Sequence, residues 1–429
     1  MPELPKKLVD LITEAKKPEP TNELCFLIGS GFSRADHMLL VGDINKKLRE
    51  LKESDFFLGQ EMSAWFYKDD FVDPNQKITL FDRRFAEEFV HFYIVSECQS
   101  NPEKFNYEVF FDYFNEYLYE KQHKDKVDKF VEEHKAKYNI TGNFENGRQY
   151  LSRFLNIFNQ LVASLLTTAK YYQNISYTGG YPNYEQFSRL LKQVLKGNIV
   201  HVHSLNHDML FDHLASTVSG IFEFFSDGFT ELNSPYFGEI RQAHKINNED
   251  FYKTYKVRLQ YFNNQYKSRL RFYKLHGSVD TYPLYLQGTD ESVTIKVDYG
   301  VGEIFKEVLN KEKGQYEYVY PFSNKYPAYL TGTTQKIKRY EDPFFAELFN
   351  HFKNNLQSSE KLIVIGYGFQ DKGINDLLEA NFLSSGKRIF VVDIKAPECD
   401  LLKKYPDQFT ITGTGIAETH FDQYMEFLN

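Results

Sequence analysis

Four turns in this chain of 429 residues carry side chains suited to gripping a nucleotide and moving a proton. They are Gly29–Arg34, the pair Asn206 and Asp208, the pair His276-Gly277, and Gly366–Asp371. Glycines let a backbone approach a ligand closely, an amide can hold a ribose hydroxyl or a water, and a histidine accepts protons near neutral pH. This combination of residue types fits a nucleotide site with a general base.

The first turn is a candidate phosphate-binding loop. A helix beginning after Ser33 would direct free backbone N–H groups at a pyrophosphate, and Arg34 would add a positive charge. Because Arg34 stands where Gly-x-Gly-x-x-Gly has its third glycine, the pattern is incomplete, and an ordinary tight turn remains the alternative. The candidate ligand contacts in this turn are Gly29, Ser30, Gly31, Ser33 and Arg34.

The second and third turns supply the candidate catalytic residues. Asn206 is placed to hold a ribose hydroxyl or a water, and His276, followed by a glycine that leaves room for a ligand, is the candidate base. Asp208 is a candidate ligand contact, although it also precedes a helical pattern and would serve equally as a helix N-cap. His201 and His203 alternate within a predicted strand, so we interpret them as buried, satisfied side chains.

The fourth turn adds two glycines and a carboxylate. Gly366, Tyr367 and Gly368 are expected to pass beneath a nucleotide, and Asp371 either contacts it or caps the helix that follows. Asp393 ends a further strand and is placed to accept hydrogen bonds from a ribose or adenine group. For each of these residues the alternative is a purely structural role in a turn after a strand.

Short apolar runs predict the strands that position these turns. The runs are Glu23–Gly29, Asn198–Leu205, Leu270–Leu275, Lys361–Gly366 and Lys387–Ile394. Such runs between helical patterns are typical of a parallel sheet covered on both faces, which predicts an α/β fold. Ligands bind beyond the carboxyl ends of strands in open parallel sheets, so the four turns are expected to meet at one edge of the sheet.

The spacing of the strands indicates that the sheet domain is interrupted twice. Residues 45–195 show mostly helical periodicity, clearest from Leu151 to Leu166, and predict a large helical insertion. Residues 216–268 are expected to form a smaller, irregular insertion within the sheet domain. That domain is therefore expected to comprise residues 1–44 and 196–429.

Composition narrows the function classes. A net charge of −8 and an isoelectric point near 5.9 argue against a chain built to coat nucleic acid. The basic residues and tyrosines interleaved from Tyr252 to Lys274 are interpreted as a solvated or partner-facing surface, with nucleic-acid binding as the alternative. Cys25, Cys98 and Cys399 form no Cys-x-x-Cys pair, so no zinc ribbon is expected. No apolar run is long enough to span a bilayer, and a cytoplasmic location is expected.

Taken in order, the four turns resemble motifs of the sirtuin family. Gly29-Ser30-Gly31-Phe32-Ser33 is similar to Gly-Ala-Gly-x-Ser, and Ser204-Leu205-Asn206-His207-Asp208 is similar to Thr-x-Asn-x-Asp. His276-Gly277 matches a His-Gly pair, while Gly366–Asp371 resembles the Gly-Tyr-Ser-x-x-Asp of bacterial sirtuin-like defence proteins. Tyr329–Lys336 also resembles a segment of those proteins.

The resemblance implies a Rossmann-like, sirtuin-like sheet that holds NAD, with Asn206 positioning the nicotinamide ribose or a water and His276 acting as base. The chain departs from the deacylases of the family, because it lacks the four zinc-binding cysteines and the loop Gly-Ile-Pro-Asp-Phe-Arg. Ser204 and Gly368 also replace a threonine and a serine. These departures favour hydrolysis of NAD, as the substrate, to nicotinamide and ADP-ribose, with no metal.

The resemblance also implies a biological setting. Bacterial relatives of this kind deplete NAD during phage infection, often as oligomers, and the layout resembles the type that pairs with a HerA-like hexameric ATPase. A homo-oligomer with such a partner is therefore expected. Two alternatives stay open, namely an NAD-dependent protein deacylase and a non-catalytic module that senses NAD or ADP-ribose and controls a partner.

Overall fold

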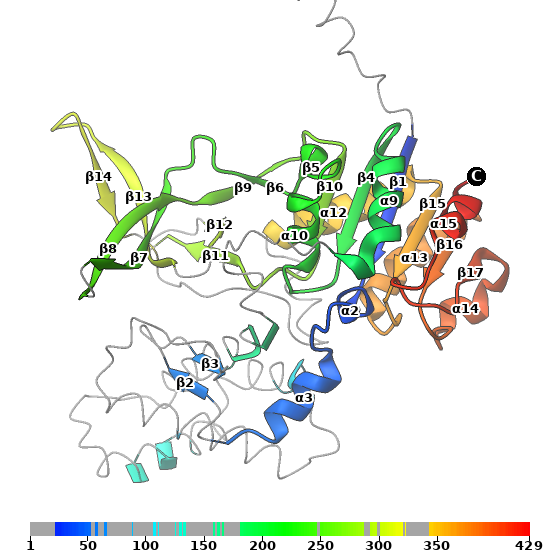
Figure 1. Cartoon of the computed structure of the whole chain (residues 1–429), viewed down its shortest axis with the longest axis horizontal. Helices are drawn as coiled ribbons and strands as arrows, with labels where there is room; N and C mark the ends of the chain where they lie inside the picture. The colour runs from blue at the N-terminus through cyan, green and yellow to red at the C-terminus, as the bar shows by residue number, and fades with distance from the viewer. Residues whose placement is uncertain are drawn as a thin grey trace, which may run out of the picture.

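The computed structural model describes residues 22–52, 181–246, 249–286, 292–297, 301–320, 322 and 343–429, together with short stretches between 56 and 166. Figure 1 shows them arranged as a parallel sheet flanked by helices, with antiparallel strands extending from one side. Tyr329–Lys336 and Cys98, which the sequence analysis names, lie outside the described residues.

The parallel sheet has seven strands. In spatial order they are β17 (Phe409–Ile411), β16 (Arg388–Val392), β15 (Lys361–Ile365), β1 (Asn22–Ile28), β4 (Asn198–Ser204), β10 (Leu270–Lys274) and β5 (Phe225–Ser226), and each neighbouring pair is parallel. The five predicted strands are thus confirmed, and with them the Rossmann-like α/β fold. The chain runs outward from β1 to β4 and β10, then returns to β15 on the other side of β1, so the strand order reverses there.

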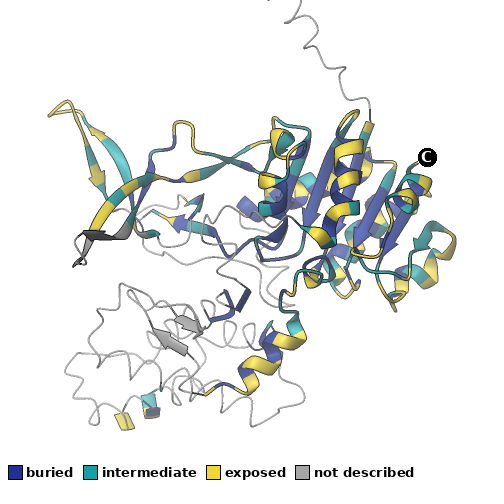
Figure 2. Cartoon of the chain, viewed as in Figure 1, coloured by how far each residue is buried: buried dark blue, intermediate teal, exposed yellow. Residues whose placement is uncertain are grey.

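Side chains of β1 alternate between two apolar clusters, one on each face of the sheet. Leu24, Phe26 and Ile28 join a cluster with α9 (Glu185–Val194), α10 (Leu210–Thr217) and α15 (Phe421–Leu428). Cys25 and Leu27 join a second cluster with α12 (Pro343–Ser358) and α13 (Lys372–Asn381). Figure 2 shows the result, buried strands between helices whose outer faces are exposed. A central strand covered on both faces explains the uninterrupted apolar run.

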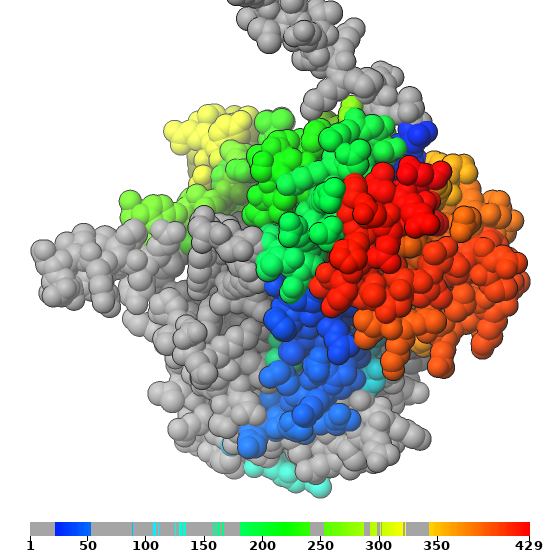
Figure 3. Space-filling view, turned by 45° about the vertical axis from the view of Figure 1, so that its right-hand side comes forward, coloured from blue at the N-terminus to red at the C-terminus, as the bar shows by residue number. Residues whose placement is uncertain are grey.

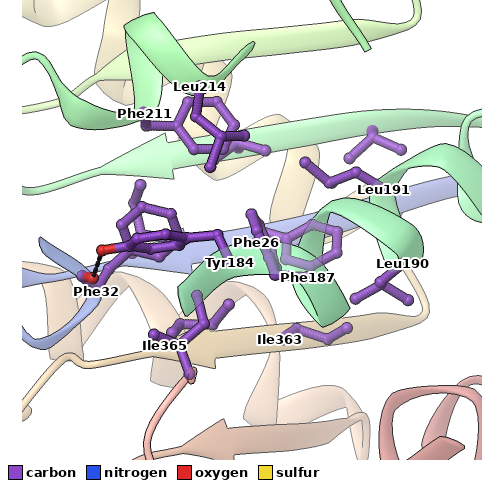
Figure 4. Close-up of a cluster of buried hydrophobic side chains, with 14 of the residues drawn as sticks. Phe26, Phe32, Tyr184, Phe187, Leu190, Leu191, Phe211, Leu214, Ile363 and Ile365 are labelled. Atoms are coloured by element: carbon purple, nitrogen blue, oxygen red, sulfur yellow. Dashed lines mark hydrogen bonds between the residues drawn. The ribbon is translucent and has the colours of Figure 1, made fainter. Parts of the chain in front are cut away.

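Helix α9, which the sequence analysis places in the helical insertion, covers the sheet instead. Figure 4 shows Phe187, Leu190 and Leu191 of α9 packed over the strands that carry Phe26 and Ile363. The 3-10 turn η3 (Pro182–Tyr184) leads into α9, and the Tyr184 hydroxyl donates to the Phe32 carbonyl at 2.7 Å. The expected boundary at residue 195 is therefore too late, because α9 supplies apolar cover that the sheet needs.

Residues 216–268, expected to be irregular, are largely strands. β6 (Gly228–Thr230) and β9 (Gln260–Gln265) join β11 (Thr281–Tyr285) and β12 (Ser292–Lys296) in one antiparallel sheet. β7 (Tyr236–Ile246) and β8 (Glu249–Arg258) join β13 (Val301–Asn310) and β14 (Gln315–Val319) in another, which extends away from the parallel sheet in Figure 1. Exposed Lys256 and Arg258 alternate with less exposed Val257 and Leu259, the period of a strand with one covered face.

The remaining elements are short. α2 (Ser30–Arg34) and α3 (Val41–Arg49) follow β1, β2 (Phe56–Leu58) pairs with β3 (Ala64–Phe66), and α14 (Asp400–Lys404) lies between β16 and β17. The other 3-10 turns are η4 (Phe222–Phe224), η5 (Leu383–Ser385) and η6 (Pro406–Gln408). Of the helix predicted from Leu151 to Leu166, the structure describes several residues as helical and buried, namely Phe158, Leu161, Val162, Leu165 and Leu166.

Strand β4 carries two buried histidines, as predicted, but they are only partly satisfied, because His201 Nε2 and His203 Nδ1 have no hydrogen-bond partner among the described residues. His201 Nδ1 lies 3.2 Å from the Tyr273 hydroxyl, and His203 Nε2 lies 3.2 Å from Asn355 Nδ2. Burial lowers the pKa of His201 to about 3 and that of His203 well below its usual value, so both rings are neutral in the fold. Glu23 lies 3.6 Å from His201 Nε2 but is 33% exposed, so water screens its carboxylate.

Acid is therefore expected to destabilise the fold through these rings. An unfolded histidine takes up a proton near pH 6.5, whereas folded His201 does so only near pH 3. Its contribution to stability is complete above pH 6.5 and is lost at about 1.4 kcal/mol per pH unit as the pH falls toward 3. Urea unfolding at a series of pH values measures this loss. His201→Gln cannot titrate and should show a shallower acid slope, and equal slopes would contradict the assignment.

Candidate functional site

The turns after β1 and β15 interlock. Gly29 N donates to the Ile365 carbonyl and Gly31 N to the Gly366 carbonyl, each at 2.9 Å. Gly366 has a φ of 62°, and a Cβ there would lie 2.3 Å from Phe32 N. These glycines are therefore needed to pack one turn on the other. The contact sits where the strand order reverses, which is the usual ligand position in such sheets. Figure 3 shows the blue surface of the first described segment adjoining both the green and the orange-to-red surfaces.

Gly366→Ala is expected to destabilise the protein by about 1–3 kcal/mol or more, because a left-handed backbone angle and a backbone clash both oppose the added methyl. Gly368→Ala is the matched control, since a Cβ on Gly368 meets nothing nearer than Gln370 Cγ at 3.9 Å. Urea unfolding of both variants measures the difference in free energy. Equal stability of the two variants would show that the close packing of these turns does not constrain the fold.

Helix α2 begins earlier than the sequence predicts. It spans Ser30–Arg34 with Gly29 as its N-cap, whereas the prediction has a helix starting after Ser33. Glycine is tolerated at the N-cap position, which explains why the first turn already initiates the helix. As a result Ser33 lies on the helix and is only 2% exposed, while Ser30 and Arg34 are exposed.

Hydrogen bonds from Asn206 connect the second turn to the first. Its Nδ2 donates to the Gly29 carbonyl and to Ser33 Oγ, each at 2.9 Å, and the side chain is buried. The Gly29 carbonyl can only accept, so the amide nitrogen must face it. Both amide hydrogens are thereby used, which leaves Oδ1 as the atom able to accept from a hydroxyl or a water.

Asp208 lies one residue before Met209, the N-cap of α10. Its Oδ1 accepts from Leu210 N, at the start of α10, at 2.9 Å. Burial raises the pKa of this carboxyl, against a smaller opposing effect of the Lys274 ammonium. Ser33 also donates toward Asp208, so Ser33 lies between Asn206 and Asp208. The N-cap of α10 is Met209, which has no side-chain cap, so Asp208 does not occupy the N-cap position that the sequence suggests.

His276 connects the third turn to the fourth. Its Nε2 lies 3.4 Å from Asp371 Oδ2, and the two side chains are 5% and 14% exposed. The ring of His207 lies on another side, with 6.1 Å between ring centroids. Asp371 also caps α13, since its Oδ1 accepts from Ile374 N at 3.2 Å. The four turns that the sequence singles out thus lie together at one edge of the sheet.

The rest of the fourth turn divides into buried and exposed parts. Tyr367 is 6% exposed, and its hydroxyl donates to the Asp371 carbonyl at 3.1 Å. The buried side chain therefore links the start of the turn to its end. Gly368 is exposed and Gly366 is half-buried. Asp393, at the end of β16, is half-buried and accepts from Lys395 N at 3.3 Å. The exposed backbone of this turn is the part that a ligand can reach.

A buried ionic cluster, which the sequence analysis misses, lies beside the second and third turns. Lys296 Nζ lies 2.6 Å from Asp227, 3.3 Å from Asp212 and 3.7 Å from Asp280. Lys274 Nζ lies 3.0 Å from Asp212 and also donates to Ser278 Oγ at 2.7 Å and to the Asp208 carbonyl. Lys274 therefore ties the turn that carries Asn206 to the turn that carries His276. Because the charges of the cluster come from separate elements, no local pattern in the sequence indicates it.

Opposite charges in this cluster keep Asp212 and Lys296 ionised. Burial alone would raise the pKa of Asp212, but Lys274 and Lys296 outweigh it and lower that pKa. Burial alone would lower the pKa of Lys296, but Asp227, Asp280 and Asp212 raise it well above its usual value. Such a cluster is stable only while every member keeps its partner.

Three of the interleaved basic residues, Arg269, Lys274 and Lys256, make contacts within the fold. Arg269 donates to the carbonyls of Leu195 and Lys196, and Lys274 is buried in the ionic cluster. Lys256 lies 3.6 Å from the ring centre of Tyr318 on β14, away from the parallel sheet.

Within the described part of the chain, no group of three or more His, Cys, Asp or Glu side chains is arranged to hold a metal ion. Among the helices described there, none combines the length and apolar character needed to cross a bilayer. Cys25 and Cys399 are buried and free.

The sequence matches no protein family model and no curated protein. Solved structures similar to the chain include a Sir2 homolog–NAD complex, with 10% identity and a TM-score of 0.33 over 100% of this chain and 96% of that one. A complex of a mutant Sir2 homologue with ADP ribose has 9% identity and a TM-score of 0.35, over 99% and 96% of the two chains. Likenesses this weak carry no argument about the site, whose interpretation rests on its own geometry.

Proposed function

We propose that the chain is an NAD hydrolase that cleaves the bond between nicotinamide and ribose. The observation that carries the proposal is the meeting of the four turns. Asn206 bonds to the turn that contains Gly29 and Ser33, that turn interlocks with Gly366, and His276 lies against Asp371. A glycine-rich backbone, an oriented amide and a histidine at the carboxyl edge of a parallel sheet suit a dinucleotide and a hydrolytic water.

Departure of nicotinamide needs little general-acid catalysis. Nicotinamide leaves NAD as a neutral molecule with the electrons of the broken C–N bond, and an oxocarbenium-like ribose remains. Water oxygen then bonds to the anomeric carbon and gives up a proton, so the products are ADP-ribose, nicotinamide and one proton. We assign Asn206 Oδ1 to the ribose or the water and His276 to the departing proton. The exposed turns around Ser30, Arg34 and Gly368 would face the phosphates.

Incubation of the purified chain with NAD alone tests the proposal. Nicotinamide and ADP-ribose should appear in equal amounts without any peptide. Release that depends on an acylated lysine peptide would identify a deacylase instead. Saturable binding of NAD or ADP-ribose without turnover would identify a sensing module. A variant lacking His276 serves as the blank for contaminating activities.

The motif resemblance supports a further part of the proposal. We infer a homo-oligomer that depletes NAD during phage infection together with a HerA-like hexameric ATPase. Bacteria carrying both genes should lose cellular NAD after infection, whereas bacteria carrying the His276→Ala variant should keep it. Retained NAD in the presence of both intact proteins would contradict this role without touching the proposed chemistry.

A further inference from the structure

The contact between His276 and Asp371 joins residues that come from strands separated by two others in the sheet. His276 follows β10 and Asp371 precedes α13, with β4 and β1 lying between β10 and β15. The two side chains nevertheless come to 3.4 Å between Nε2 and Oδ2, and both are largely shielded from water. The contact is an ion pair only when the imidazole is protonated, and its present geometry is not that of a hydrogen bond.

Asp371 is held in place independently of His276. Its Oδ1 accepts from Ile374 N at 3.2 Å, which caps α13. Its own carbonyl accepts from the Tyr367 hydroxyl at 3.1 Å, and that hydroxyl also lies 3.0 Å from Asn375 Oδ1. Asn375 Nδ2 in turn donates to the Phe369 carbonyl at 2.8 Å. One carboxylate oxygen is thus used by the helix, and the other points toward the imidazole from a braced turn.

We propose that Asp371 is the positioning residue for His276, holding the imidazole through Nε2 so that Nδ1 is the proton acceptor. The proposal rests on the proposed function and deepens it, because it assigns to Asp371 a role beyond capping or ligand contact. A carboxylate oxygen 3.4 Å from Nε2 favours the tautomer that carries the proton on that nitrogen.

The carboxylate would act at one step. When water attacks the anomeric carbon, its proton passes to Nδ1, and the ring then carries a proton on each nitrogen and a positive charge. The Asp371 carboxylate stabilises that charge without taking the proton itself, as an orienting carboxylate does in other histidine-dependent hydrolases. The proton on Nδ1 leaves to solvent after the products depart, which returns the ring to its starting form.

Asp371→Asn separates this role from the helix cap. Asparagine caps helices as well as aspartate, so α13 and the thermal midpoint should change little. We expect kcat for nicotinamide release to fall at least about tenfold with a nearly constant KM for NAD, and the acidic limb of the pH profile to move to lower pH. Asp376→Asn is the control, because Asp376 is an exposed carboxylate on the same helix that pairs with Lys372 at 2.6 Å. An unchanged pH profile in Asp371→Asn would overturn the proposal.

A measurement without NAD keeps the two proposals distinguishable. Spectra of protein labelled with ¹⁵N-histidine report which ring nitrogen carries the proton, and His276→Gln assigns the signal by its loss. In the unmodified chain we expect the proton of neutral His276 on Nε2, and in Asp371→Asn a changed tautomer balance and a lower titration midpoint. Identical His276 signals in the two proteins would refute the positioning role even if NAD is cleaved. Changed signals without NAD cleavage would support the role and refute the proposed function.

Discussion

His276→Ala is expected to lower the rate of nicotinamide release from NAD by about 10²- to 10⁴-fold, because it removes the base while the other three turns stay in contact. His276 is 4% exposed, and its loss leaves a small cavity at the end of β10 without breaking a strand contact. Steady-state assays of nicotinamide formation, with circular dichroism to verify folding, measure the effect. His420→Ala, which removes an exposed histidine at the start of α15, is the control.

Asn206→Ala should reduce turnover to a similar degree but with an additional cost in stability. The substitution removes Oδ1 and two hydrogen bonds, to Ser33 Oγ and to the Gly29 carbonyl, which still accepts from Phe32 N. Each lost hydrogen bond costs about 0.5–1.5 kcal/mol. Near-full turnover in a folded Asn206→Ala or His276→Ala protein, with NAD cleavage verified, would show that the assigned roles are wrong.

Lys296→Met is expected to destabilise the fold by about 3–5 kcal/mol at neutral pH, because it leaves three buried aspartates with Lys274 as the remaining cation of the cluster. The control is Lys313→Met, which removes a 65% exposed lysine paired with Glu317 of β14 and should cost little. Urea unfolding gives both free energies.

The effect of Lys296→Met should shrink in acid. The folded pKa of Asp212 is lowered, so its contribution is present above its ordinary pKa of 3.8 and is lost as the pH falls through the folded value. The two proteins should therefore converge in stability at low pH. A constant difference across the titration would mean that Lys296 stabilises by packing of its methylene groups and not by its charge.

The parallel sheet was predictable because its central strands are buried on both faces. β1, β4, β10, β15 and β16 each read as an apolar run, and a turn of glycine or polar residues follows four of them. The rule that ligands bind beyond the carboxyl ends of such strands then placed the turns at one edge. No side-chain contact was needed for that inference.

The antiparallel strands and the ionic cluster were not predictable in the same way. At the end of β8, Tyr255 and Val257 alternate with Lys256 and Arg258, and that pattern is also typical of a solvated surface. The cluster joins Asp212, Asp227, Asp280 and Lys296, which come from separate elements. These charges come together only in the folded protein, so no local residue spacing predicts the cluster.

The start of α2 was predicted a few residues too late. The sequence indicates a glycine turn and a following helix, but Gly29 acts as the cap, so the turn and the first helical residues are the same residues. Helix boundaries inferred from patterns alone commonly shift by a few residues. Here the shift moves Ser33 from the ligand-facing side to a buried hydrogen bond with Asn206.

Gly31 and Gly366 meet although most of the chain separates them. A ribosome adds about 5–20 residues per second, so β15 emerges tens of seconds after β1. Through that interval the nascent polypeptide lacks one wall of the edge where the four turns meet. Synthesis itself therefore delays the moment at which this edge of a newly made copy is complete.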